Sequence, residues 1–489
     1  MTNYDVIVIG AGNAALSAAL SAKDNGAKKV LVLEKASLKE KGGNSRYTNG
    51  AYRFAYNGFS DLKKIIPSLK NSNCIDYGRY RVADFLKDMN KVTQGKTDKK
   101  LSKALTSKSF ETIQWLSKKG LKFTPIKGRQ SFKVNGVMKY WGGLTLEVEG
   151  QGEKLINSML KIVKKNKIDI KYDTAAVDLI YLENKVKGVE VISKNKTKKI
   201  LAKSIILACG GFESSSEMRT RYLGPGWEMA KVRGTKHNTG DGLTMALKIG
   251  ASPFGNWSGC HAVFHDMNGP EFSDLKISNK YRKISYPWGI VLNADGDRFV
   301  DEGEDFRNFT YAKFGKEVIK QPNQIGWQIF DHKVRHMLYP EYDVKSATMV
   351  KANSIKELLN KISSINSQNA LKTINEFNKA VKEKIKFDPT IKDKKCTEGL
   401  KINKTNWANK LDKPPFYAYG VTCGITFTFG GLRVNEKCQV LNKVMKPIKG
   451  LYAAGEMVGG IFYFNYPGGS GLTSGAVFGK IAGKSAAKF

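Results

Sequence analysis

The opening of the chain is a continuous apolar run that ends in a glycine-rich turn. Tyr4–Ile9 predicts a buried strand of a parallel sheet, and the sequence GAGNAA follows it at residues 10–15. Gly10 permits a tight turn, Gly12 lets the backbone approach a pyrophosphate, and Ala15 allows close packing of helix on strand. The amino end of the next helix would offer N–H groups and partial positive charge to phosphates. This pattern predicts a Rossmann-like dinucleotide-binding fold.

A second strand with an acidic end supports this interpretation. Val30–Leu33 is apolar, and Glu34 follows it where a carboxylate can accept hydrogen bonds from ribose hydroxyls. The fingerprint alone does not separate FAD from NAD. The residues expected to contact the nucleotide at this end are Gly10, Gly12, Asn13, Ala14, Glu34 and Lys35.

The remaining pattern predicts an α/β protein with a discontinuous main domain. Residues 1–254 and 411–489 would form a mixed sheet with helices on both faces, and 255–410 an inserted α+β capping or substrate domain. Two strand pairs are predicted from apolar runs separated by short turns: 168–172 with 175–181, and 186–192 with 199–207. Helices are predicted over 354–386 and 475–487.

The charge balance is strongly basic, with 81 Lys and Arg against 44 Asp and Glu and a formal net charge of +37. A lysine bias on solvated faces explains this best, and attraction of an anionic substrate or an acidic membrane surface is the alternative. No nucleic-acid partner is expected, because the lysines are spread along the chain without a recognition motif.

The apolar runs and the cysteines of the sequence predict its cellular location and its metal content. No apolar run reaches the length of a transmembrane helix, and the first strand leaves no room for a signal peptide, which predicts a cytoplasmic protein. Peripheral association with the inner membrane is a second expectation. The six cysteines are scattered without metal-ligand spacing, so no metal site is expected.

Further motifs occur in an order that marks a resemblance. They are Gly42-Gly43-Asn44-Ser45, Ala208-Cys209-Gly210-Gly211-Phe212, Thr239-Gly240-Asp241-Gly242 and Gly450-Leu451-Tyr452-Ala453-Ala454-Gly455-Glu456. With them the chain resembles the fumarate reductase/succinate dehydrogenase flavoprotein superfamily from Tyr4 to its C-terminus. Within that superfamily, three further segments are most similar to the FAD-dependent tricarballylate dehydrogenases. They are Asp301-Glu302-Gly303 with Phe306-Arg307-Asn308, Trp257-Ser258-Gly259-Cys260-His261-Ala262 and Tyr463-Phe464-Asn465-Tyr466-Pro467-Gly468-Gly469.

The resemblance implies FAD as cofactor and a set of contacts to it. Asn44 and Ser45 would lie at the diphosphate, Val177 would meet the adenine through its backbone, and Glu456 would bind ribityl hydroxyls. Backbone N–H groups near the flavin O2 edge would stabilise negative charge on the reduced ring. No histidine follows in the glycine loop, so non-covalent FAD is predicted. The full implied set is Gly43, Asn44, Ser45, Val177, Gly210, Asp241, Glu456, Gly471 and Leu472.

Three residues are candidates for the reaction itself. Arg307 follows the segment Gly296–Glu302, one position later than the proton-shuttling arginine of fumarate reductases. It could move a proton, clamp a carboxylate or form a surface salt bridge. His261 would bind substrate or be a satisfied core histidine, and Tyr466 would contact substrate, act as a base or form an aromatic wall.

The expected reaction is desaturation of a carbon–carbon bond next to a carboxylate, with hydride passing to flavin N5. Tricarballylate to cis-aconitate is the implied case, with a small carboxylate as substrate and a membrane-associated electron-transfer partner. Phe427-Thr428-Phe429 and Tyr466 stand where fumarate reductases carry a histidine and an arginine. A Δ-dehydrogenase of a steroid-like ketone, an enoate reductase of the fumarate reductase type and a non-catalytic electron-transfer subunit therefore stay open.

Overall fold

The computed structural model describes residues 4–127, 130–140, 143 and 146–489. The chain divides into two compact units. The first unit comprises Met1–Pro225, Gly234–Cys260 and Phe427–Phe489. The second comprises Gly226–Arg233 and His261–Thr426. From the sequence we expected functional domains that meet at 254/255 and at 410/411. These limits stay a prediction.

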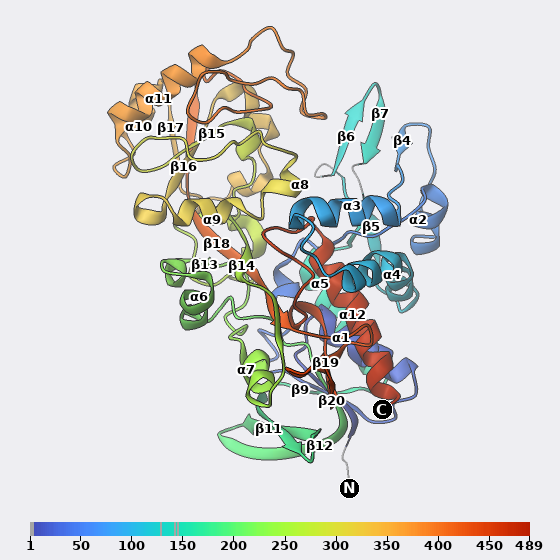
Figure 1. Ribbon diagram of the computed structural model, residues 1–489. Coiled ribbons are helices and arrows are strands. Elements are labelled where there is room, and N and C mark those ends of the chain that lie inside the picture. The colour runs from blue at the N-terminus through green and yellow to red at the C-terminus, as the bar shows by residue number, and fades with distance from the viewer. Residues whose placement is uncertain (1–3, 128–129, 141–142, 144–145) are drawn as a thin grey trace. The chain divides into compact units, whose positions relative to one another are not determined.

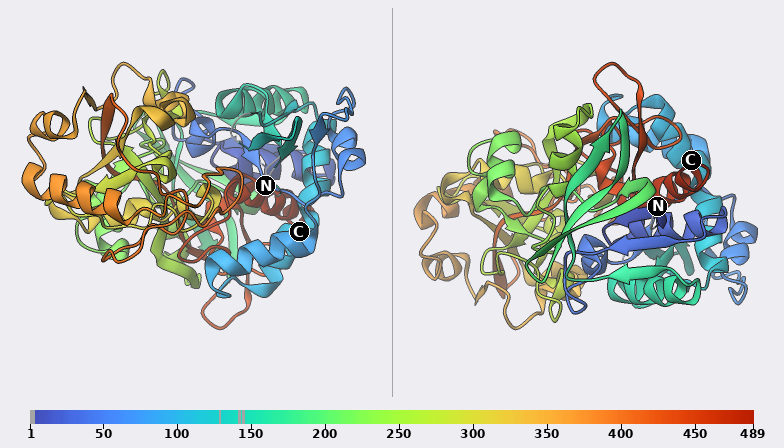
Figure 2. Two further views of the ribbon diagram at one scale, coloured as in Figure 1. Left: turned by 90° about the horizontal axis from the view of Figure 1, so that it is seen from above. Right: turned by 90° about the horizontal axis from the view of Figure 1, so that it is seen from below.

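The first unit is built on an eight-stranded mixed sheet in the order β10-β11-β20-β12-β1-β2-β9, with β19 paired to β20. The view from below in Figure 2 shows the long green strands of this sheet beside the blue amino-terminal ones. Its strands are β1 (Tyr4–Ile9), β2 (Val30–Leu33), β9 (Asp169–Lys171), β10 (Ala175–Leu182), β11 (Lys185–Ser193), β12 (Lys196–Leu207), β19 (Gln439–Leu441) and β20 (Pro447–Ala453).

The centre of this sheet is parallel, as the apolar runs predict. β1 lies between β12 and β2 with Val8 opposite Ile206 and Val32, and all three side chains are buried. One predicted pairing is wrong: β9 pairs in parallel with β2, and β10 pairs with β11. The outer edge of β2 has backbone groups that need partners, and β9 satisfies them. The second predicted pair, β11 with β12, is confirmed.

Helices and two small sheets complete the first unit. The helices are α1 (Asn13–Asp24), α2 (Phe59–Ile65), α3 (Val82–Thr93), α4 (Lys99–Lys118), α5 (Gln151–Lys165), α6 (Ser216–Leu223), α7 (Asp241–Lys248) and α12 (Ser470–Ala487), with short 3-10 turns η1 (Gly43–Tyr47) and η8 (Gly455–Met457). The small sheets have the orders β3-β8-β5 (Ala51–Tyr52, Leu146–Val148, Phe123–Pro125) and β4-β7-β6 (Ile75–Asp76, Val137–Tyr140, Ser131–Val134).

The last helix packs directly on the first. Figures 1 and 2 show α12 in red beside α1 in blue, although the two are separated by almost the whole sequence. Gly475, Gly479 and Gly483 face α1, and a Cβ at Gly479 or Gly483 would clash with the backbone oxygens of Ala14 or Ala18. Glycine is therefore needed here for the close approach of two helix backbones.

The second unit is organised around the sheet β13-β18-β16-β15, in which β14 and β17 also pair with β18. Its strands are β13 (Lys231–Val232), β14 (Pro253–Asp266), β15 (Ile290–Leu292), β16 (Gly326–Phe330), β17 (Met349–Ala352) and β18 (Phe416–Leu432). β14 and β18 begin in one unit and end in the other. Its helices are α8 (Arg307–Thr310), α9 (Phe314–Ile319), α10 (Ile355–Asn360) and α11 (Ser367–Ala380), and its 3-10 turns are η2 (Trp227–Met229), η3 (Ser278–Tyr281), η4 (Tyr286–Trp288), η5 (Pro322–Gln324), η6 (His332–Met337) and η7 (Pro340–Tyr342).

The helical stretch expected over 354–386 is two helices. α10 and α11 are separated by 361–366, because the Asn366 side chain accepts a hydrogen bond from the N–H of Asn369 and so starts a new helix. Both helices bury apolar side chains, such as Leu358 and Phe377, in the core of the second unit. Among the described residues, no helix is both long enough and apolar enough to cross a bilayer.

The contact between α1 and α12 gives a direct stability test. Gly483→Val places two methyl groups against the backbone of α1, and we expect it to lower the free energy of unfolding by about 1–3 kcal/mol. Lys484→Val adds the same side chain at the exposed neighbouring position and is the control. Chemical denaturation of both variants measures the difference. Equal stability of the two variants would contradict tight packing of these helices.

Candidate functional site: a dinucleotide cradle in the first unit and a cationic cluster in the second

The turn between β1 and α1 forms an open helix amino end. Gly10 has φ of 104°, and a Cβ there would lie 2.5 Å from the backbone oxygen of Ala208. α1 is capped by Gly12 in extended conformation, with no side-chain cap and no acidic residue in its first turn. The N–H groups at this end therefore face no competing carboxylate of the helix itself. These features fit the pyrophosphate of a dinucleotide.

Glu34 ties the end of β2 to this turn. Its carboxylate accepts hydrogen bonds from the N–H groups of Ala11 (3.0 Å) and Ala36 (2.9 Å), and the side chain is buried. Burial raises the pKa of Glu34, and the two N–H donors oppose this rise. Glu34 therefore stabilises the turn. It lies at the position where we expect a ribose hydroxyl to bind.

The glycine loop predicted at the diphosphate is held through its side chains. Gly43 starts η1 with φ of 53°, and Ser45 Oγ accepts a hydrogen bond from the N–H of Asn13 at 3.0 Å. Asn44 Nδ2 donates to Glu213 Oε1 at 2.6 Å, and Asn44 Oδ1 accepts from the N–H of Thr235 at 2.8 Å. Ser45 and Asn44 thus join this loop to α1 and to the segments after β12.

Lys35 and Asp241 form one ion pair. Lys35 Nζ lies 2.7 Å from Asp241 Oδ2 and donates to Thr239 Oγ1 at 2.6 Å. Asp241 is the first residue of α7, where the helix dipole favours a negative charge. Val177, expected at the adenine, lies on β10 at an irregularity of the pairing with β11 and is 41% exposed.

The C-terminal segment returns to the amino end of α1. Asn13 Nδ2 donates to the backbone oxygen of Leu472 at 2.8 Å, and Tyr52 donates its hydroxyl to Asn13 Oδ1 at 2.7 Å. α12 begins after Gly469, which has φ of 84° and offers no side-chain cap. Gly471 and Leu472 therefore lie in the first turn of a helix whose amino end can stabilise negative charge.

Next to this helix end lies an aromatic cluster of Phe427, Phe429, Phe462 and Tyr466. The rings of Phe427 and Tyr466 meet edge to face with centroids 5.1 Å apart, and Phe462 contacts both at 6.0 and 5.6 Å. A Cβ at Gly471 would lie 3.7 Å from Phe427 and 3.8 Å from Tyr466. The structure thus brings predicted residues Gly471 and Tyr466 together within the first unit.

Glu213 lies beside the glycine loop, although no sequence motif pointed to it. It is fully buried, and its Oε1 accepts from the side-chain amides of Asn44 and Asn238, each at 2.6 Å. It follows predicted residue Gly210, whose backbone lies against Asn238. The signal was present, because an acidic residue directly after the apolar strand end Ala208–Phe212 needs buried partners.

In the second unit, Arg307 is a cation held by aromatic rings. Its guanidinium lies 5.1 Å from the ring centroid of Tyr339 and 5.9 Å from that of Tyr311. Burial lowers the pKa of Arg307, but the nearby tyrosines and Glu341 outweigh it and raise the pKa above its usual value. No ion pair between Arg307 and a described carboxylate is found, which speaks against the surface salt bridge. Arg307 therefore stays charged and suits binding of an anion.

His261 packs on the same tyrosine as Arg307. Its ring meets Tyr311 edge to face at 5.0 Å, and the side chain is 1% exposed. Burial lowers the pKa of His261 well below its usual value, and Arg233, Lys316 and Arg282 lower it further. His261 is therefore neutral at ordinary pH and can act through hydrogen bonds, not as a cation.

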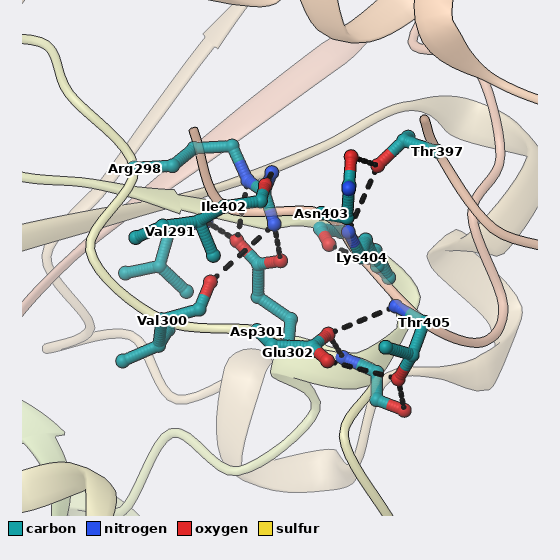
Figure 3. Close-up of polar contacts among 12 residues, drawn as sticks. Val291, Arg298, Val300, Asp301, Glu302, Thr397, Ile402, Asn403, Lys404 and Thr405 are labelled. Carbon is teal, nitrogen blue, oxygen red and sulfur yellow. Dashed lines mark hydrogen bonds and ion pairs between the residues drawn. The ribbon is translucent and has the colours of Figure 1, made fainter. Parts of the chain in front are cut away.

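Arg298 has a structural role in the second unit (Figure 3). Its Nε donates to the buried carboxylate of Glu302 at 3.1 Å, and Glu302 also accepts from the N–H of Val291. Lys404, also labelled there, donates to the backbone oxygens of Pro287 and Gly289, and burial lowers its pKa to about 8. Among the described residues, no group of acidic, histidine and cysteine side chains is arranged to hold a metal ion.

Comparison with known proteins identifies the family of the chain. The profile of the family described as FAD binding domain matches residues 5–472. A probable fumarate reductase of Shewanella frigidimarina is 30% identical over 486 residues, covering 99% of this chain and 74% of that protein. A urocanate reductase of Eggerthella lenta is 27% identical over 99% of this chain and 75% of its own length.

Solved structures of flavoenzymes are also similar to this chain. The open conformation of a flavocytochrome c3 fumarate reductase matches with a TM-score of 0.73 and 26% identity, over 99% of this chain and 78% of that one. A 3-ketosteroid delta1-dehydrogenase from Sterolibacterium denitrificans has a TM-score of 0.76 at 21% identity, over 99% of both chains, and shows the shared fold. These findings confirm the expected superfamily, fold class and cofactor, whereas tricarballylate as substrate stays a prediction. The chain belongs to the FAD binding domain family and is an FAD-dependent oxidoreductase acting on CH–CH groups.

Proposed function

We propose that this enzyme reduces the carbon–carbon double bond of an enoate whose remaining substituent is apolar or aromatic. The observation that carries the proposal is the aromatic cluster beside the amino end of α12. Bound FAD supplies the electron pair for such a reaction, and the protein has to orient the substrate and provide a proton.

The aromatic cluster favours one apolar group on the substrate. Phe427, Phe429 and Phe462 offer ring edges and faces, and Tyr466 adds a hydroxyl that can donate or accept a hydrogen bond. The four side chains of this cluster are uncharged. A substituent such as a phenyl or imidazole ring would fit this chemistry, and the similar urocanate reductase is named for a ring-bearing enoate.

Arg307, in the second unit, is by itself a candidate binding partner for one carboxylate. Its raised pKa keeps the guanidinium charged, and the flanking rings of Tyr311 and Tyr339 leave it free of a described carboxylate partner. We assign Arg307 to the substrate carboxylate, with neutral His261 as a hydrogen-bonding neighbour. Delivery of a proton by Arg307 to the adjacent carbon would need a lowered pKa, whereas its surroundings raise the pKa.

Within the first unit, the amino end of α12 is the proposed contact on the cofactor side. Backbone N–H groups at Gly471 and Leu472 would stabilise negative charge at the flavin O2 edge, as the resemblance implies. Glu34, Ser45 and Asn44 hold the turn and the loop that would receive the dinucleotide. We further propose that FAD is bound non-covalently, because no histidine occurs in the loop 42–48.

Tricarballylate desaturation to cis-aconitate is the second candidate. The charged Arg307 and the net charge of +37 both suit a substrate with several carboxylates. Whether the enzyme oxidises or reduces its substrate, the flavin needs an electron-transfer partner. We propose that this partner is a separate protein with an acidic docking surface, either bound to the membrane or free in solution. The NADH:fumarate oxidoreductase of Klebsiella pneumoniae is a longer relative, of which this chain spans 48%.

A comparison of acceptors tests the proposed substrate. The enzyme is reduced chemically without oxygen and mixed with cinnamate, fumarate, cis-aconitate or a 3-keto-1,4-diene steroid. We expect cinnamate to restore the visible flavin absorbance with a kcat/KM at least about tenfold above that of fumarate. A preference for cis-aconitate would favour the tricarballylate reaction, and a preference for the steroid would favour the ketone reaction. Either result contradicts the proposal.

Arg307 is tested by Arg307→Gln, which keeps a hydrogen-bonding group and removes the charge. We expect kcat/KM for the best enoate to fall about 100-fold, because a charge-assisted pair with the carboxylate is lost. The FAD content should not change. Arg221→Gln is the matched control, since Arg221 is an exposed arginine of α6 paired with Glu217. Retained activity in Arg307→Gln would remove this residue from substrate binding.

Phe427 is tested by its effect on two substrates. Phe427→Ala removes the ring that contacts both Phe462 and Tyr466, so an aryl substituent loses packing. We expect kcat/KM for cinnamate to fall about 10- to 100-fold, and that for fumarate to change less than about threefold. An equal loss for both substrates would show that Phe427 supports the fold and does not select the substituent.

A further inference from the structure

The cofactor-binding unit contains two glutamates in direct contact. Glu213 follows β12 and is fully buried, whereas Glu456 lies in η8 after β20 and is partly buried. The carboxyl group of Glu456 lies against the backbone at Gly211, two residues before Glu213, and the two carboxyl groups interact with each other. Two ionised carboxylates can only accept hydrogen bonds, so this contact requires a proton on one of them.

The other oxygens of both groups meet donors. Glu213 Oε1 accepts from Asn44 Nδ2 and Asn238 Nδ2, each at 2.6 Å. Glu456 Oε1 accepts from the N–H of Thr428 at 2.7 Å and from its hydroxyl at 3.0 Å. Glu213 Oε2 is buried and meets no described N–H or O–H donor. Of the two oxygens of Glu213, this one is therefore the one that has room for a proton.

The backbone is shaped to admit this contact. A Cβ at Gly211 would clash with the carboxyl of Glu456 and with Thr428 Oγ1. At Gly234 it would clash with the amide of Asn44, and at Gly210 it would lie 2.6 Å from the amide of Asn238. Three glycines from two segments thus leave room for the side chains that meet at Glu213, so the arrangement is built into the chain and is not an accident of one rotamer.

We propose that Glu213 is a neutral carboxylic acid that donates its proton to ionised Glu456 and thereby positions Glu456 and Asn44 for the flavin cofactor. Glu456 keeps acceptor capacity for the ribityl hydroxyls that the resemblance implies, and Asn44 is fixed in the glycine loop. Glu213 is a positioning residue in this scheme and does not touch the substrate. The inference concerns cofactor binding and does not depend on the proposed enoate substrate.

The electrostatics agree with this assignment. Burial raises the pKa of Glu213 well above its usual value, and the charge of Glu456 raises it further. Burial also raises the pKa of Glu456, but its hydrogen bonds from Glu213 and Thr428 lower it. A further charged group that touches Glu213 is Arg219 of α6, which donates to its backbone oxygen at 2.7 Å. The ion pair of Lys35 and Asp241 lies beside the turn at Gly240. The N–H of Gly240 donates a hydrogen bond to the backbone oxygen of Gly211.

The direction of the pH dependence follows from these shifts. A glutamate whose pKa is raised by folding stabilises the folded form at low pH, and this contribution is lost as the pH rises through the raised pKa. Above that pH, both carboxylates are charged and repel each other. We therefore expect the wild-type enzyme to bind FAD more weakly on the alkaline side of the transition.

The test compares three variants by FAD affinity, measured by fluorescence titration across pH. Glu213→Gln mimics the protonated acid, because its amide can donate to Glu456 and its oxygen can accept from Asn44 and Asn238. We expect its FAD affinity to lie within about threefold of wild type at low pH and to lose the alkaline weakening. Glu213→Ala should bind FAD about tenfold more weakly or worse at all pH values. Glu217→Gln, an exposed change in α6, should behave as wild type.

Infrared spectroscopy gives an independent readout that does not need activity. The wild-type protein should show the carbonyl band of a buried protonated carboxylic acid, and Glu213→Gln should lack it, whereas Glu217→Gln should retain it. If Glu213 were ionised, Glu213→Gln would lose FAD affinity as strongly as Glu213→Ala, and the band would be absent from wild type. Either of these results would overturn the proposal.

Discussion

The close contact of α1 (Asn13–Asp24) and α12 (Ser470–Ala487) is the constraint on which the cofactor site depends. Glycines on α12 allow the two helix backbones to touch, and hydrogen bonds from Asn13 to Leu472 and from Ser21 to Lys480 fix their register. The amino ends of both helices are thereby brought to one region, each without a side-chain cap. The partial positive charge of two helix amino ends can serve a ligand that is negative at its phosphates and at its reduced ring.

Buried polar groups around this region are held by mutual contacts, since each would be costly alone. Glu34 is satisfied by two backbone N–H groups, and Glu213 by two side-chain amides and its partner Glu456. The second unit follows the same rule with the buried pair of Arg298 and Glu302. Arg307 differs, because its charge lies between aromatic rings and forms no ion pair with a described carboxylate, which is why we assign it to the substrate.

The sequence predicted the local elements well and their long-range pairing less well. The strand, turn and helix at 4–24 have the expected limits within a few residues, since apolar runs and glycines act locally. The partner of β9 (Asp169–Lys171) was predicted wrongly, because strand pairing depends on which sheet edge is open in the folded chain. The sequence pattern likewise gave no reason to separate α10 from α11, which a single capping asparagine decides.

By itself, the sequence determined the fold class, the FAD family and the position of the phosphate-binding turn, because these depend on residue types at fixed short spacing. Only the tertiary structure decided which side chains meet. It placed Glu213 against Asn44, Asn238 and Glu456, and it placed Gly471 beside the ring of Tyr466. Such contacts join segments far apart in the chain, and their geometry is set by the packing of helices and strands that no local pattern encodes.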